Sequence, residues 1–114
     1  NFIDLQFGKF DKELKALQSK YGLNIRSINE IDNYNDIDNL AALINCLDLV
    51  ITTQNSTLHL AGALGKKTWG MLAKNARWHW LKNEKKTLWY SSVKIFQQEK
   101  YGDWSNIIND ISFE

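Results

Sequence analysis

The stretch from Asp48 to Leu72, with the sequence DLVITTQNSTLHLAGALGKKTWGML, constrains the fold more than any other part of the chain. It predicts a buried strand over Asp48–Thr52, followed by a polar loop and a helix over Ser56–Leu64 that Gly65 ends. A second buried strand is expected over Thr68–Leu72. Short apolar runs on both sides of a helix are typical of a β-α-β unit in a parallel sheet.

The rest of the chain continues this alternation of strands and helices. Apolar periodicity predicts three further strands, over Phe2–Gln6, Leu23–Ile28 and Ser92–Gln97, and three further helices, over Lys12–Tyr21, Leu40–Leu47 and Trp104–Ile111. We expect Glu30–Asn39 to be a loop, Ala73–Trp80 a loop or short helix, and Lys82–Lys86 to be solvated. The chain of 114 residues is therefore expected to form one α/β domain over residues 1–114, with an open, mostly parallel sheet and flanking helices.

Several details of the helices follow from their termini and apolar faces. Capping carboxylates are expected at Asp11, at either Asp36 or Asp38, and at Asp103. Gly22 is expected to end the first helix. The last helix should bury Trp104, Ile107, Ile108 and Ile111.

Composition excludes several classes of function. The net charge of +1 gives no reason to expect nucleic-acid binding. Cys46 is the one cysteine, so no disulfide can form within the chain, and we expect Cys46 to pack as a small hydrophobe. No apolar run is long enough to cross a bilayer. The absence of a possible disulfide within the chain fits a reducing, cytoplasmic setting, with the inner face of the membrane as a further location. The two histidines lie twenty residues apart, so we expect no metal.

The polar loop between the two central strands is the first candidate site. Strand ends and helix N-termini meet at such a loop, where unpaired N–H groups and the helix dipole favour a phosphate. Neutral donors surround this position: Thr53, Gln54, Asn55, Ser56, Thr57 and His59. The same residues are equally explained by an ordinary capped helix with His59 satisfied by a carbonyl. The sequence pattern alone favours neither explanation.

Other residues are weaker candidates. Lys74 and Arg77 follow a strand at the same end of the sheet and could neutralise a diphosphate, although loop cations are commonly just solvated. Asp11 follows the first strand and could accept ribose hydroxyls, although capping is simpler. The aromatic run Trp78–Trp80, followed by Trp89 and Tyr90, could stack on a base or sugar ring, but we expect it to cover an edge of the core with one ring left exposed. Ala61–Ala63 should allow close approach of helix and sheet.

Taken together, LAALINCLDLVITTQNSTLHLAGALGKKTWGML, RWHWL, LWYSSVKIFQQ and GDW resemble a known family. The succession is similar to the C-terminal domain of bacterial glycosyltransferases related to the ADP-heptose:lipopolysaccharide heptosyltransferases. The likeness is greatest to the branch associated with tetratricopeptide repeats. It covers roughly Phe2 to Ile111, and the order of the motifs is more specific than any one of them.

The resemblance implies one Rossmann-like half of a glycosyltransferase-B fold that binds a nucleotide-sugar donor. The family contacts the donor phosphates with the residues matching Gln54, Asn55, Ser56 and His59. The turn matching Gln6, Gly8 and Asp11 lies near the nucleoside. The acceptor would be a glycan, a lipopolysaccharide or a protein, and no cofactor beyond the donor is implied.

Three departures from the family bear on activity. Gln54 stands where the family has an aspartate, Lys67 where it has a proline, and Arg77 where it has another aspartate. The family's first strand of this domain, and the N-terminal half with the catalytic base and acceptor site, would precede Phe2. We therefore expect no catalytic residue in this chain, the N-terminal half of the same protein as a partner, and self-association through an exposed sheet edge. The alternative is a non-catalytic α/β module that keeps the fold and uses its aromatic surface for protein contacts.

Overall fold

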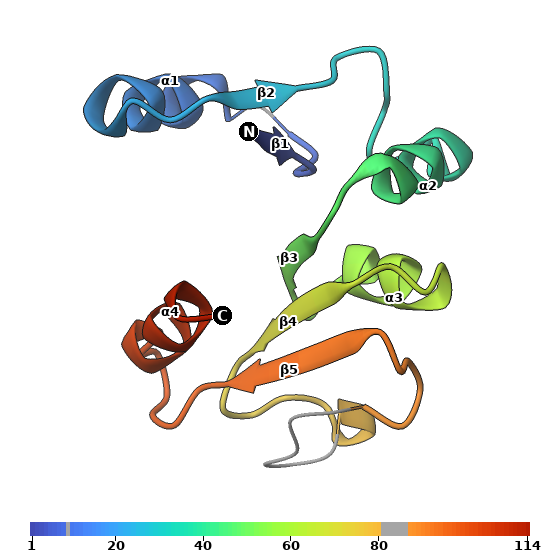
Figure 1. Cartoon of the computed structure of the whole chain (residues 1–114), viewed down its shortest axis with the longest axis vertical. Coiled ribbons are helices and arrows are strands. Elements are labelled where there is room, and N and C mark those ends of the chain that lie inside the picture. Colours follow the sequence, from blue (N-terminus) through green and yellow to red (C-terminus); the bar gives the residue numbers. More distant parts are fainter. Residues whose placement is uncertain (9, 81–86) are drawn as a thin grey trace. The chain divides into compact units, whose positions relative to one another are not determined.

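The computed structural model describes residues 1–8, 10–80 and 87–114, so the expectation for Lys82–Lys86 lies outside the described residues. The chain forms two compact units, Asn1–Ala42 and Leu43–Glu114, and helix α2 (Ile37–Cys46) contains the boundary between them. Each unit has its own small parallel sheet (Figure 1). The prediction of an α/β fold with parallel strands and flanking helices is confirmed.

The first unit contains two short parallel strands and the helix that connects them. Strand β1 (Phe2–Asp4) lies parallel to β2 (Ile25–Ser27), and α1 (Asp11–Tyr21) connects them. Gly22 ends α1 in the left-handed conformation, with its N–H donating to the Gln18 carbonyl over 2.9 Å. This C-terminal stop was predicted.

The prediction that Asp11 caps α1 is wrong. Phe10 occupies the N-cap position of α1, makes no side-chain cap hydrogen bond, and Asp11 is the first residue of the helix. An acidic residue there still interacts favourably with the positive end of the helix dipole. The second helix begins at Ile37, inside the expected loop, and Asp36 caps it by accepting the N–H of Asn39 over 3.1 Å.

The second unit contains the β-α-β segment that the sequence predicted. Strands β3 (Val50–Thr53), β4 (Thr68–Leu72) and β5 (Val93–Gln97) form a parallel sheet in that order. Helix α3 (Ser56–Ala63) joins β3 to β4, and the short helix η1 (Trp78–Trp80) follows β4. Helix α4 (Ser105–Ser112) follows β5.

Both ends of α3 are defined by local hydrogen bonds. Asn55 is extended, and its side chain accepts the N–H of Leu58 over 3.1 Å. At the other end Gly65 has φ of 69°, and two N–H groups turn back, from Gly65 to the Gly62 carbonyl and from Lys66 to the Ala61 carbonyl. This pair of bonds is a Schellman motif, so the predicted stop at Gly65 is confirmed.

The core of the second unit lies between α3, the sheet and η1. Its buried residues are Leu58, Leu72, Trp80, Val93 and Ile95. Gly70 allows α3 to approach β4, because a Cβ atom there would lie 3.1 Å from the Leu58 methyl groups. The close approach of helix and sheet therefore depends on a glycine in the strand as well as on the small residues of the helix.

Several side chains expected to be buried are exposed. Ile51 is 45% exposed because β3 is the end strand of its sheet, and Cys46 at the end of α2 is exposed as well. In α4, Ile107 is fully buried, whereas Ile108 is 54% exposed. Trp104 precedes α4 as its N-cap residue and is partly exposed, and the Asp103 carboxylate accepts the Ser105 N–H over 2.9 Å.

Among the helices of the described residues, none has the length and apolar character needed to cross a membrane.

Candidate functional site

The polar loop lies where the sequence placed it, at the carboxyl end of β3 and the N-terminus of α3. Its backbone turns through a hydrogen bond from the Asn55 N–H to the Thr53 carbonyl, 2.9 Å long. The Thr52 hydroxyl donates to the Asn55 side-chain oxygen over 3.2 Å, which fixes the orientation of the capping amide. Thr52 and Asn55 thus hold the loop in shape.

The first turn of α3 keeps backbone donors that no helical carbonyl can reach. Asn55 accepts one of them, the N–H of Leu58, and this leaves the N–H groups of Ser56 and Thr57. Ser56 is exposed and Thr57 is half-buried, so the turn is open to a ligand. Thr53 and Gln54 are exposed beside it. An anion placed at this turn would meet two N–H groups and the positive end of the helix dipole.

His59 lies one turn into α3 and is half-buried against aromatic rings. Its Nδ1 atom lies 3.0 Å from the Tyr90 hydroxyl, and its ring centre lies 4.9 Å from the ring of Trp80. The ring of His79 is 5.6 Å away. The sequence allowed for a carbonyl as the partner of His59, but the partner is a tyrosine hydroxyl from a residue 31 positions later.

Burial lowers the pKa of His59 below its usual value of 6.5, and the nearby His79 lowers it further. The imidazole is therefore neutral at neutral pH, as expected for a histidine near a helix N-terminus. A neutral ring has one N–H to donate. With Nδ1 facing Tyr90, the Nε2 atom is the one left to meet a ligand.

The two loop cations predicted to neutralise phosphate lie beyond β4. The Lys74 amine donates to the Glu99 carbonyl, and the Lys74 N–H donates to the Gln98 side chain over 3.2 Å. Lys74 thus ties its loop to the segment after β5. Arg77 is exposed, and within the described part of the chain its guanidinium makes no hydrogen bond or ion pair.

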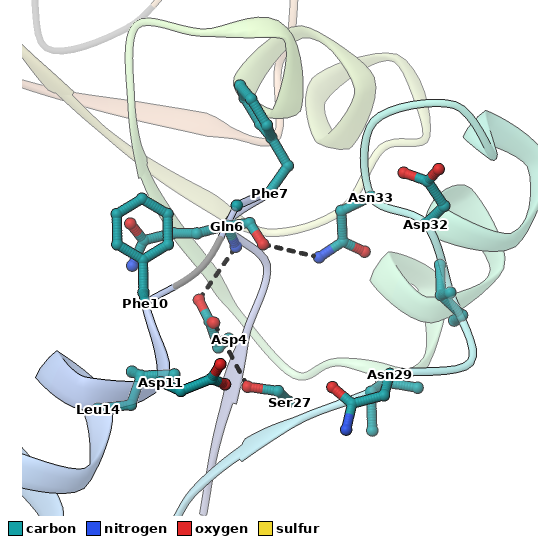
Figure 2. A pocket seen from close by; sticks show the side chains of 13 residues that line it. Asp4, Gln6, Phe7, Phe10, Asp11, Leu14, Ser27, Asn29, Asp32 and Asn33 are labelled. Carbon is teal, nitrogen blue, oxygen red and sulfur yellow. Dashed lines mark hydrogen bonds between the residues drawn. The ribbon is translucent and has the colours of Figure 1, made fainter.

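The first unit contains a pocket of about 200 Å³ at the carboxyl ends of β1 and β2. Figure 2 shows its lining, which includes all three residues predicted to lie near a nucleoside: Gln6, Gly8 and Asp11. The Gln6 N–H donates to Asp4 over 3.0 Å, and the Gln6 carbonyl accepts from the Asn33 amide over 3.2 Å. The three residues that the family resemblance assigns to one turn therefore line one cavity.

The lining of this pocket is polar and acidic. Asp4, Asp11 and Asp32 contribute carboxylates, Phe7 and Phe10 contribute rings, and no lysine or arginine is among the described lining residues. Hydrogen bonds from Asn35 and Tyr34 lower the pKa of Asp32, so this carboxylate stays charged. Such a lining suits an uncharged ring with hydroxyl or N–H donors and disfavours a phosphate.

Two polar groups, one in each unit, were not predicted from the sequence. In the first unit, Asn33 places its side-chain Oδ1 atom in a buried position without a hydrogen-bond partner among the described residues. In the second unit, Tyr90 was expected only as one of the aromatic residues that cover an edge of the core. No sequence pattern indicated its contact with His59, because the two residues lie in separate parts of the chain that share no apolar periodicity.

Within residues 1–8, 10–80 and 87–114, no group of three or more histidine, cysteine, aspartate or glutamate side chains is placed to hold a metal ion.

Comparison with known proteins gives one informative similarity. The protein FlbA of Caulobacter vibrioides is 38% identical to this chain over 103 residues. The aligned region covers 90% of this chain and 17% of the length of FlbA. The sequence matches no model of a known protein family, and no solved structure matches it. The chain is thus similar to a short part of a much longer protein.

Proposed function

We propose that this chain is the donor-binding part of a glycosyltransferase, related to the heptosyltransferase-like enzymes and built as the C-terminal Rossmann-like half of a glycosyltransferase-B fold. Its ligand is a nucleoside diphosphate sugar. The diphosphate binds at the N-terminus of α3, through the N–H groups of Ser56 and Thr57 and the His59 ring. Separately, we assign nucleoside binding to the pocket of the first unit lined by Gln6, Gly8 and Asp11.

The observation that carries this proposal is the open first turn of α3. The N–H groups of Ser56 and Thr57 have no partner among the described residues, and with a neutral histidine and flanking hydroxyls they form a neutral donor set, which suits a diphosphate without a metal. The pocket of the first unit has a different chemistry. Its carboxylates and rings suit a ribose and a base, and they would repel a phosphate.

The whole enzyme's activity and acceptor also belong to this proposal. In the family that the sequence resembles, the catalytic base and the acceptor site belong to the N-terminal half, so we assign catalysis to that half of the protein. Transfer of the sugar then requires that part to be present. Gln54 takes the position of the family's carboxylate, and we assign it no catalytic role.

The substitution Asn55→Asp tests the phosphate site directly. Aspartate caps helices as well as asparagine does, so the fold should keep its stability. The new negative charge would lie beside the bound diphosphate and should weaken ADP, GDP or UDP binding by about tenfold or more. Binding is measured by calorimetry. The matched control is Asn109→Asp, at an exposed position of α4, and equal affinity in both variants would contradict the proposal.

A specific observation favours the alternative function of a protein-contact module. Trp78 is 81% exposed, and Leu88 and Trp89 are exposed as well. The Trp89 ring donates its N–H to the His79 carbonyl over 2.8 Å, which holds that ring against η1. Loss of a protein partner on Trp78→Ala, with nucleotide binding absent from the wild type, would favour this module over the glycosyltransferase.

A further inference from the structure

We propose that Tyr90 is a positioning residue that fixes His59 in one tautomer, with the proton on Nε2. The role of this tautomer in ligand binding rests on the proposed function, whereas the tautomer itself does not. The inference starts from the 3.0 Å contact between the Tyr90 hydroxyl and His59 Nδ1.

The chemistry of the two groups decides which one donates. A phenol hydroxyl is a good donor, because its oxygen lone pair is delocalised into the ring, whereas the unprotonated nitrogen of an imidazole is a strong acceptor. No other hydrogen-bond partner of the Tyr90 hydroxyl exists among the described residues. Donation to Nδ1 therefore satisfies both groups. The proton of the neutral imidazole must then be on Nε2.

The surroundings hold the two rings in this geometry. The Tyr90 ring lies on Gly62 of α3, where an added Cβ would be 2.5 Å from the Tyr90 Cγ atom. The rings of Tyr90 and His59 meet edge to face, with centres 5.8 Å apart. His59 also packs against Trp80, which is 1% exposed, with ring centres 4.9 Å apart. Tyr90 is thus seated by a glycine, and His59 by a core tryptophan.

His59 therefore offers its Nε2–H as a preset donor, that is, a donor already in place at the first turn of α3 before a ligand binds. A histidine free to exchange tautomers would present an acceptor to a phosphate part of the time. A ring held with its proton on Nε2 presents a donor, and no tautomer change is needed when the ligand binds. Preorganisation of this kind lowers the cost of binding.

The test is a long-range ¹H–¹⁵N spectrum of the histidine rings in the chain without ligand, at a pH where His59 is neutral. The expected result is an Nε2–H tautomer, with the Nδ1 resonance shifted by the accepted hydrogen bond. Tyr90→Phe keeps the ring on Gly62 and removes the hydroxyl, so Nδ1 should move to the position of an unbonded nitrogen. Tyr101→Phe, at an exposed tyrosine of the same unit, is the matched control and should cause no shift.

An Nδ1–H tautomer in the wild type would overturn the proposal, as would an Nδ1 resonance that Tyr90→Phe leaves unmoved. If Tyr90→Phe does not fold, the wild type alone decides, through a scalar coupling between the Tyr90 hydroxyl proton and His59 Nδ1. Detection of the coupling supports the proposal and its absence, with the hydroxyl proton resolved, contradicts it.

Titration with inorganic pyrophosphate separates this inference from the proposed function. Tyr90→Phe should weaken pyrophosphate binding about two- to tenfold, the effect of one hydrogen bond. A wild type that binds no pyrophosphate would contradict the proposed function and leave the tautomer result standing. Equal pyrophosphate affinity of wild type and Tyr90→Phe, with the tautomer changed, would contradict the role of the preset donor.

Discussion

Gly62 has no side chain, and the Tyr90 ring occupies the space that a side chain would fill. The substitution Gly62→Ala should therefore displace Tyr90 and remove its hydrogen bond to His59. We expect a loss of about 1–3 kcal/mol in the free energy of unfolding, the usual cost of overpacking, in spite of the better helix propensity of alanine. Urea unfolding measures this loss.

The control for Gly62→Ala is Ala63→Ser, which adds one atom at an exposed position of the same helix. It should change the stability by less than about 1 kcal/mol. A Gly62→Ala protein as stable as the wild type would show that the Tyr90 ring is not held in this position.

His59 should make the stability depend on pH. Its pKa is lower in the folded chain than the usual 6.5, so between these two values the unfolded chain binds more protons than the folded chain. The contribution of a neutral His59 is complete above about pH 6.5 and decreases as the pH falls toward the lowered pKa. The free energy of unfolding, measured from about pH 8 to about pH 5, should fall more in the wild type than in His59→Gln. Identical pH profiles would contradict the buried environment of His59.

The sequence indicated the residues of the polar loop and the turn of Gln6, Gly8 and Asp11, but not the side chains that contact them. Capping by Asn55 follows a local rule over three residues, and for that reason it was predictable. The contacts of His59 with Tyr90 and of Gln6 with Asn33 join positions that are far apart in the chain. No periodicity or spacing predicts such pairs, because they depend on how the elements pack.

Helix α2 is held at its C-terminus by a lysine from another part of the second unit. The Lys66 amine donates to the carbonyls of Asn45 and Leu47, over 2.9 and 2.7 Å. A cation at this end of a helix satisfies carbonyls that lack helical partners and interacts favourably with the dipole. The loop after α3 thus anchors α2.

The substitution Lys66→Met should lower the free energy of unfolding by about 1–3 kcal/mol, because it removes hydrogen bonds from a charged donor. Lys67→Met is the matched control. Lys67 is exposed, with its amine 5.7 Å from the centre of the Trp69 ring, and its loss should cost about 1 kcal/mol or less. Thermal unfolding of both variants measures the difference. Similar losses would show that the helix contact of Lys66 contributes little.

The bounds of helices and strands with long apolar patterns were predicted more accurately than the bounds of those with short patterns. Strand β4 has the predicted bounds, and α3 differs by one residue, because both lie in the central β-α-β segment with strong patterns. Strand β1 is shorter than expected, and Asp36 begins α2 earlier than expected. Cap positions at Asp11 and Phe10 depend on backbone geometry that side-chain types alone do not determine.

The whole chain consists of two compact units, and each contains one candidate site. The proposed phosphate site belongs to the second unit, and the pocket lined by Gln6, Gly8 and Asp11 belongs to the first. The sequence predicted one domain and self-association through a sheet edge, and self-association stays a prediction.

The central claim is that a nucleoside diphosphate binds at the N-terminus of α3. The direct measurement is a ¹H–¹⁵N titration of the chain with ADP, GDP and UDP, beside inorganic pyrophosphate and the free nucleosides. We expect at least one nucleoside diphosphate, and pyrophosphate, to shift Ser56, Thr57 and His59. A free nucleoside is expected to shift Gln6 and Gly8 of the first unit. If none of these ligands shifts either group at millimolar concentration, the chain does not bind the donor as proposed.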